Sequence, residues 1–182
     1  MLQYLQSHSR PDITYAVAQC ARFTHAPRRS HERALEHIGQ YLKGTMNEGL
    51  ILQPSQDLIL ECYVDADFAG LWPHEDKFDP TCVKSRSGYV ICIANCPIVW
   101  KSKLQDTIAL ATMEAEYNAL SFAMKTVLPL QQLFKGIAAS IGLSSDQVTT
   151  FKTVVHEDNQ GTLQLANMEP GVFPIVIEFR FR

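Results

Sequence analysis

The order of the apolar segments constrains the fold of this 182-residue chain more than any other feature. Three strand-like segments follow one another at residues 58–66, 87–95 and 97–102. The dipeptides around Asn95 predict a tight hairpin between the last two. A helical apolar spacing then begins at Thr112, is expected to kink or break at Pro129, and continues to about Gly142. A β-rich run at 151–156 and a short helix complete the order, which predicts an α/β fold with one mixed sheet flanked by helices.

Two further helices are predicted before the sheet. Apolar residues at helical spacing favour a first helix that opens near Arg10 and ends at Pro27. A second helix is expected to start with Ser30 as its N-cap and to stop at Lys43-Gly44. Its apolar face would consist of Leu35, Ile38 and Leu42. We therefore expect a small helical hairpin over residues 1–55 and a sheet domain over residues 56–182.

Composition limits the class of protein. Hydrophobic residues make up 46% and charged residues 19% of the chain, which is typical of a globular protein. No apolar run is long enough for a membrane span, and no export signal is evident, so we expect no membrane partner. The net charge of −3 argues against nucleic-acid binding by charge alone. Five cysteines without zinc-site spacing indicate reduced thiols and an intracellular location.

Three acidic stretches are the candidates for a catalytic metal site. They are Asp65/Asp67 and Glu157/Asp158 at strand ends, and Glu114/Glu116 at the start of a helix. Strand ends and helix starts of an open α/β sheet can meet in one crevice. Carboxylates gathered there would bind Mg²⁺, and two such ions can promote in-line displacement at a phosphodiester. The alternative is a set of solvated acids in a surface turn and a first helical turn. The residues alone do not choose between the two acids of a stretch.

A succession of short motifs resembles a known family. The motifs are DADFAG at 65–70, SRSGYV at 85–90, WKSKLQ at 100–105, EAEYNAL at 114–120 and EDNQ at 157–160. In this order they resemble the ribonuclease H domain of copia-type retrotransposon Pol polyproteins. SRPDITYAV at 9–17 and YLKGT at 41–45 resemble the end of that family's reverse transcriptase. The resemblance covers roughly residues 2–173, and each motif is weak by itself.

The resemblance implies a ribonuclease H fold and activity. A ribonuclease H of this kind hydrolyses the RNA strand of RNA–DNA hybrids during reverse transcription, with two Mg²⁺ ions that Mn²⁺ can replace. Matched by position, Asp65, Glu116 and Asp158 would be the catalytic metal ligands. The polymerase domain of the parent polyprotein would be the partner, in the cytoplasm, a virus-like particle or the nucleus. The alternative function is a catalytically inert remnant or a structural module of a reverse transcriptase.

Polar residues near the expected crevice are candidates for contact with the hybrid, which proteins recognise by its shape and its 2′-hydroxyls. They are Lys101, Ser102, Lys103, Gln105, Asn159 and Gln160. A solvated edge strand beside a buried Trp100 explains the first four equally well. Capping of the following helix is the interpretation we favour for Asn159.

The resemblance is lost after Pro174. Relatives continue there with a basic, His-containing segment and help to supply a fourth carboxylate. Here the chain carries Glu178 between apolar residues, and this is the one candidate for the fourth acid. We therefore expect a fragment of a longer chain with a truncated, frameshifted or divergent C-terminus, and its nuclease activity depends on whether three acids suffice.

Overall fold

The computed structural model describes residues 1–70, 72, 78–142, 152–168 and 177–181. Among them, five strands form one sheet in the order β3-β2-β1-β4-β5. The strands are β1 Leu60–Asp67, β2 Arg86–Ile93, β3 Cys96–Leu104, β4 Thr153–Glu157 and β5 Ile177–Phe181. β1, β2 and β3 pair antiparallel, whereas β4 is parallel to both β1 and β5. The predicted mixed α/β sheet is confirmed, and the arrangement is consistent with a ribonuclease H-like fold.

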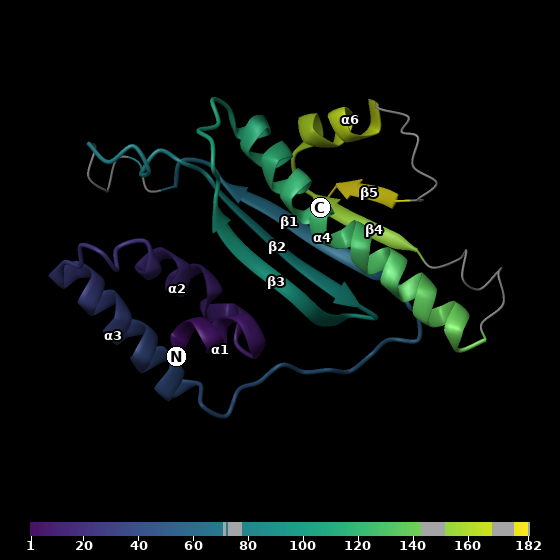
Figure 1. The fold of residues 1–182 in the computed structure, drawn as a ribbon, viewed down its shortest axis with the longest axis horizontal. Coiled ribbons are helices and arrows are strands. Elements are labelled where there is room, and N and C mark those ends of the chain that lie inside the picture. The colour runs from purple at the N-terminus through teal and green to yellow at the C-terminus, as the bar shows by residue number, and fades with distance from the viewer. Residues whose placement is uncertain (71, 73–77, 143–151, 169–176, 182) are drawn as a thin grey trace.

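The long helix α4, Thr112–Ser140, crosses the sheet and closes its core (Figure 1). Alternate residues of β1 are buried against it, namely Leu60, Cys62 and Val64. The helix meets them with Ala119, Ala123 and Val127, which are fully buried. These small side chains at helical spacing let the helix backbone approach the sheet closely, so the start of α4 is held firmly over β1.

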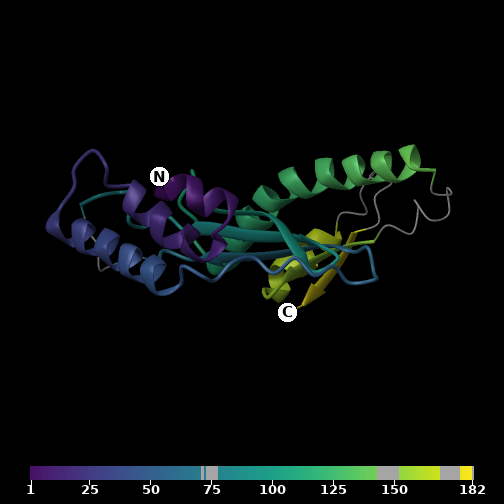
Figure 2. The same ribbon diagram turned by 90° about the horizontal axis from the view of Figure 1, so that it is seen from below.

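Pro129 does not interrupt α4, contrary to the sequence-based expectation. The helix continues to Ser140 and is drawn as one rod in Figure 2. Proline removes one helical N–H, a local cost that packing can offset. Two buried residues flank it on the sheet side, Val127 and Gln131, and the Gln131 amide donates a hydrogen bond of 2.8 Å to Thr153 Oγ1.

The predicted hairpin between β2 and β3 is present. Its turn residues, Ala94 and Asn95, both have positive φ angles, 49° and 66°. Two consecutive left-handed residues fit a tight hairpin whose twist matches that of the strands. Cys96 and Pro97 already belong to β3.

The N-terminal region contains more helices than the predicted hairpin. They are α1 Leu2–His8, the 3-10 helix η1 Pro11–Ile13, α2 Thr14–Ala21 and α3 Arg29–Gly44. Ile13, Val17 and Ile38 form a small core of their own. Leu35 was expected on this face but is 45% exposed. Ser30 does not cap α3, because the N-cap is Arg28, two residues earlier, and the Arg28 N–H donates to His31 Nδ1 at 3.0 Å.

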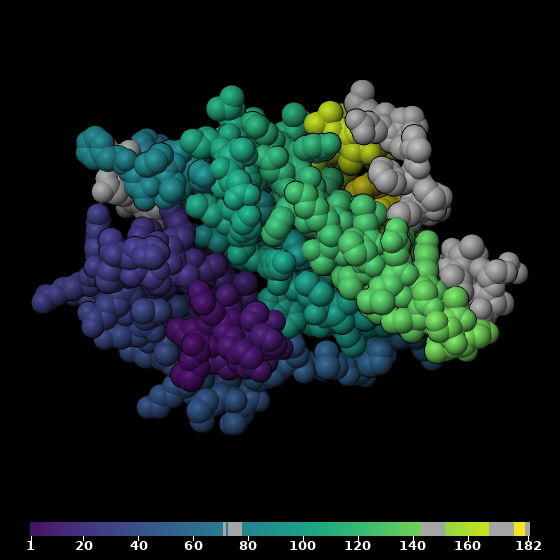
Figure 3. Space-filling view, viewed as in Figure 1, coloured from purple at the N-terminus to yellow at the C-terminus, as the bar shows by residue number. Residues whose placement is uncertain are grey.

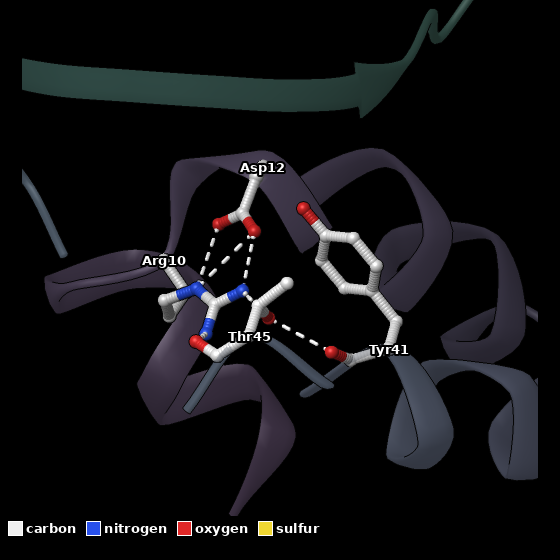
Figure 4. A network of polar contacts seen from close by, with 4 residues as sticks. All are labelled: Arg10, Asp12, Tyr41 and Thr45. Atoms are coloured by element: carbon white, nitrogen blue, oxygen red, sulfur yellow. Dashed lines mark hydrogen bonds and ion pairs between the residues drawn. The ribbon is translucent and has the colours of Figure 1, made fainter. Parts of the chain in front are cut away.

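Arg10 ties the start of η1 to the end of α3 (Figure 4). Its guanidinium donates to Asp12 Oδ2 at 2.6 Å, to Thr45 Oγ1 at 2.6 Å and to the Thr45 carbonyl at 3.1 Å. The Thr45 hydroxyl donates in turn to the Tyr41 carbonyl at 2.8 Å. Charge-assisted bonds of this kind fix orientation well, so the helices form one packed unit.

This helical unit lies beside β3, the edge strand of the sheet (Figure 1). The Trp100 indole N–H donates to the Gln6 carbonyl, and an Arg86 guanidinium N–H donates to Gln19 Oε1 at 3.0 Å. In the space-filling view, the N-terminal helices and α4 occupy neighbouring parts of one face (Figure 3). The division into residues 1–55 and 56–182 stays a prediction. No helix in the described part of the chain has both the length and the apolarity to cross a bilayer.

Candidate metal centre

The register of two parallel strands brings Asp65 and Asp158 together. β1 and β4 pair from Leu60 with Thr153 to Tyr63 with His156. Two residues further along each strand direction, Asp65 and Asp158 reach the same level of the sheet. The end of β4 at Glu157 leaves room beside β1 at this point, so both carboxylates are exposed at one end of the strand pair.

Glu116 comes to the same place from α4. It lies in the second turn of the helix and is only 8% exposed. Each of the three residues Asp65, Glu116 and Asp158 offers a carboxylate oxygen, and these oxygens lie within 4.8 Å of one another. We refer to these three residues as the acidic triad. The structure thus gathers the three acids that the motif resemblance had selected.

The triad is electrostatically costly without a cation. Burial, followed by the charges of Glu157, Asp65 and Asp158, raises the pKa of Glu116 to about 8, against a backbone hydrogen bond from Ala66. Glu116 Oε2 is buried and has no hydrogen-bond partner among the described residues. Buried carboxylate oxygens without partners are unfavourable, and a bound divalent cation would supply the missing positive charge.

The donor set of the triad fits magnesium. It consists of oxygen atoms alone, which is the preference of Mg²⁺, and two of its three members are exposed, which leaves space for retained waters. Mn²⁺ accepts the same ligands. Among the described residues no cysteine joins this group, and Cys62 of β1 is buried in the core under α4.

Three acids were left open by the residues alone, and two of them, Asp67 and Glu114, have contacts outside the triad. Asp67 Oδ2 accepts a hydrogen bond of 3.4 Å from the Tyr15 hydroxyl. Glu114 Oε2 accepts a hydrogen bond of 2.7 Å from the Leu110 N–H, just ahead of α4. Glu114 therefore stabilises the entry into the helix, where a negative charge is favoured by the helix dipole.

Gln105 differs from the expectation of a substrate contact. It is 8% exposed, and its amide donates to Ser87 Oγ at 3.0 Å and to the Ala115 carbonyl at 2.8 Å. Its oxygen faces the Asn118 amide at 3.5 Å. Gln105 therefore connects the sheet to the first turns of α4 instead of facing solvent.

The other candidate contacts on β3 lie at the surface. Lys101 and Ser102 line a cleft of about 280 Å³ that Asp65 also lines. Ser102 Oγ accepts a weak hydrogen bond of 3.4 Å from Arg86. Lys103 is exposed and pairs with Asp106 at 3.0 Å. Trp100, which the alternative interpretation of this strand took to be buried, is half-buried in the same cleft.

The EDNQ motif divides between two roles. Asn159 Oδ1 accepts a hydrogen bond of 3.0 Å from the Thr162 N–H and so caps α6, Gln160–Met168. This agrees with the capping interpretation. Gln160 is the exposed first residue of that helix.

Glu178 does not join the triad. It lies in β5 opposite Val154, four residues before Asp158, which is roughly 13 Å along the strand direction. There it forms ion pairs with Lys152 and, at 2.6 Å, with Arg180. These hydrogen bonds lower its pKa to about 2. Glu178 is therefore not a fourth acid of the triad, because β5 places it beside the start of β4, whereas Asp158 follows the end of β4.

Glu157 is a residue whose position the sequence analysis did not anticipate. The sequence analysis placed it with Asp158 in one of the three acidic stretches but did not predict that it is completely buried. Burial, followed by the charges of Asp158 and Asp65, raises its pKa to about 7, against a backbone hydrogen bond from Asn159. Strand alternation was the available signal, since Thr153, Val155 and Glu157 share one face and the first two are core residues.

Comparisons with known proteins find Pol polyproteins of transposons and one protein with a different name. The chain is 41% identical over 120 residues to the Retrovirus-related Pol polyprotein from transposon RE1 of Arabidopsis thaliana, covering 66% of this chain and 8% of that protein. It is 34% identical over 165 residues to the Retrovirus-related Pol polyprotein from transposon TNT 1-94 of Nicotiana tabacum, covering 91% of this chain and 11% of that protein. It is also 35% identical over 122 residues to the Secreted RxLR effector protein 161 of Plasmopara viticola, covering 67% and 80%.

The chain spans about a tenth of the length of the two Pol polyproteins. No family model matches it. No solved structure matches it either.

Proposed function

Since the chain belongs to the retrovirus-related Pol polyproteins of copia-type transposons, we propose that it is their ribonuclease H segment, preceded by the end of the reverse transcriptase. The observation that carries this proposal is the acidic triad, whose carboxylate oxygens lie within 4.8 Å of one another at the end of β1 and β4. The proposed activity is hydrolysis of the RNA strand of an RNA–DNA hybrid.

The triad would hold the metal. Asp65 and Asp158 are exposed and would bind the ion from the solvent side, and Glu116 would bind it from the protein side through its unpartnered Oε2. Mg²⁺ or Mn²⁺, in a two-ion arrangement, would activate a water and stabilise the leaving oxygen. The chain itself contributes the fixed positions of the three carboxylates, because β1, β4 and α4 all pack on one core.

The cleft next to Asp65 is the proposed entrance for the hybrid. Lys101 offers a positive charge there and Ser102 a hydroxyl, which suit phosphate and 2′-hydroxyl groups. The net charge of −3 provides little general attraction for nucleic acid. We therefore propose that the polymerase domain of the parent polyprotein supplies most of the affinity for the hybrid.

Cleavage of a labelled RNA–DNA hybrid tests this function. We expect Mg²⁺- or Mn²⁺-dependent cleavage that Asp65→Asn abolishes. Asp67→Asn is the matched control, because it removes the same charge from the same strand but lies outside the triad, and it should keep most of the activity. Absence of cleavage at high protein and metal concentrations would refute the enzymatic proposal.

An inert remnant or a structural module of a reverse transcriptase is the second candidate. It is favoured by the position of Glu178, which pairs with Lys152 and Arg180 instead of completing the triad. This candidate predicts a folded chain whose melting temperature does not rise when Mg²⁺ is added. A metal-dependent rise that Asp65→Asn removes would contradict it.

A further inference from the structure

Glu157 combines complete burial with an unpartnered oxygen. It closes β4, and its Oε1 accepts a hydrogen bond of 3.2 Å from the Asn159 N–H. Its Oε2 is buried and has no hydrogen-bond partner among the residues that the structure describes. Burial of a carboxylate oxygen without a hydrogen-bond partner is energetically unfavourable unless a donor from outside the chain reaches it.

The side chain of Glu157 is directed toward the acidic triad. Thr153 and Val155, which share its face of β4, contact α4 through the Gln131 hydrogen bond and the common core. Glu157 therefore points to the α4 side of the sheet, near the start of that helix. Its charge has the largest electrostatic effect of any single charged residue on Glu116. Glu157 thus lies next to Asp158 on the protein side of the triad, with its Oε2 buried and unpartnered among the described residues.

We propose that Glu157 is a positioning residue of the metal site, whose Oε2 accepts a hydrogen bond from a water on the ion held by the acidic triad. This inference rests on the proposed function. Glu157 does not belong to the set of oxygens within 4.8 Å of one another, so it lies outside the direct ligands. Mg²⁺ commonly keeps several waters, and outer carboxylates that bind such waters orient them. The site thereby gains a fourth carboxylate from β4, next to Asp158.

Binding of Mn²⁺ alone, followed by electron paramagnetic resonance of the free ion, tests the proposal on the whole chain. Glu157→Gln keeps the size of the side chain and an acceptor for the Asn159 N–H, but it loses the charge. We expect the affinity for Mn²⁺ to fall about 10- to 100-fold, the range for outer-shell partners of metal ligands. Asp65→Asn should weaken binding at least as much.

Glu61→Gln is the matched control. It makes the same chemical change on β1, where Glu61 Oε1 bonds to His156 Nε2 at 3.1 Å, roughly 13 Å along the strand from Asp65. We expect its Mn²⁺ affinity to stay within about twofold of wild type. Glu178→Gln should behave in the same way.

A second measurement separates positioning from simple support of the fold. At saturating Mn²⁺, the relaxation rate of water protons reports the waters on the bound ion. We expect Glu157→Gln to change this rate and Glu61→Gln to leave it unchanged, since a residue that only supports the fold does not contact those waters.

Distinct results would overturn the inference. Wild-type affinity and relaxation in Glu157→Gln, with binding lost in Asp65→Asn, would refute the role of Glu157 and leave the proposed function intact. A wild-type chain that binds no Mn²⁺ would refute both. Failure of metal-free Glu157→Gln to fold would also refute the inference. The proposed role of Glu157 depends on a bound ion, so the loss of its charge should not prevent folding when metal is absent.

Discussion

Replacement of Gln105 by leucine tests the reassignment of this residue from substrate contact to internal support. The substitution keeps a similar side-chain size but removes the amide that donates to Ser87 Oγ and to the Ala115 carbonyl. Both bonds are buried. Each buried hydrogen bond contributes about 1 kcal/mol, and the groups left without a partner add to the loss. We therefore expect the free energy of unfolding to fall by about 2–4 kcal/mol.

Urea unfolding followed by circular dichroism measures this loss. Lys103→Gln is the control on the same strand, since it removes an exposed ion pair with Asp106 and a distant cation–π contact with Phe122 but no buried hydrogen bond. Such pairs contribute little, so we expect a change below about 0.5 kcal/mol. If Gln105→Leu unfolds like wild type and instead loses affinity for an RNA–DNA hybrid, the internal role is refuted and the substrate role returns.

Two further predictions follow from the site. Glu116 and Glu157 have native pKa values raised from 4.5 to about 8 and about 7, so the unfolded chain loses these protons at lower pH than the native chain does. Their contribution to metal-free stability is therefore present below pH 4.5 and is lost as the pH rises through about 7 to 8. Urea unfolding at pH 5 and pH 8 measures this loss in wild type and in Glu116→Gln, which should lose less. A larger loss of stability in Glu116→Gln than in wild type would contradict the prediction. Asn159→Ala should reduce the free energy of unfolding by about 0.5–2 kcal/mol through loss of the α6 cap, whereas Gln160→Ala should change it by less than about 0.5 kcal/mol. Equal effects of the two substitutions in urea unfolding would argue against the cap.

Local patterns predicted the elements well where burial follows the sequence period. The alternation in β1 and the helical spacing after Thr112 each mark one buried face, and both elements lie where expected. Rules for single residues were less successful. Pro129 stays inside α4 because core residues on either side of it pack on the sheet, and Ser30 is displaced as a cap because α3 begins at Arg29.

The candidate site was predictable as a set of acids but not as a geometry. Gln105 and Glu178 are polar residues in or near the segments expected to form the site. Each instead forms hydrogen bonds or ion pairs with other residues of the chain. Those partners, Ala115 on α4 and Lys152 before β4, come from other elements. Their contacts depend on how the elements pack, which no single segment specifies.

The sequence by itself determined which segments become strands and helices and that acids stand at their ends, because these properties depend on neighbouring residues. Strand alternation could not separate Asp65 from Asp67, since both lie on the same face of one strand, and within the sequence only the motif resemblance selected Asp65. The tertiary structure made that distinction through the register of β1 with β4, which sets Asp65 level with Asp158, and through α4, which brings Glu116 to them. It also turned Glu157 inward, because pairing with β1 fixes which face of β4 meets the core.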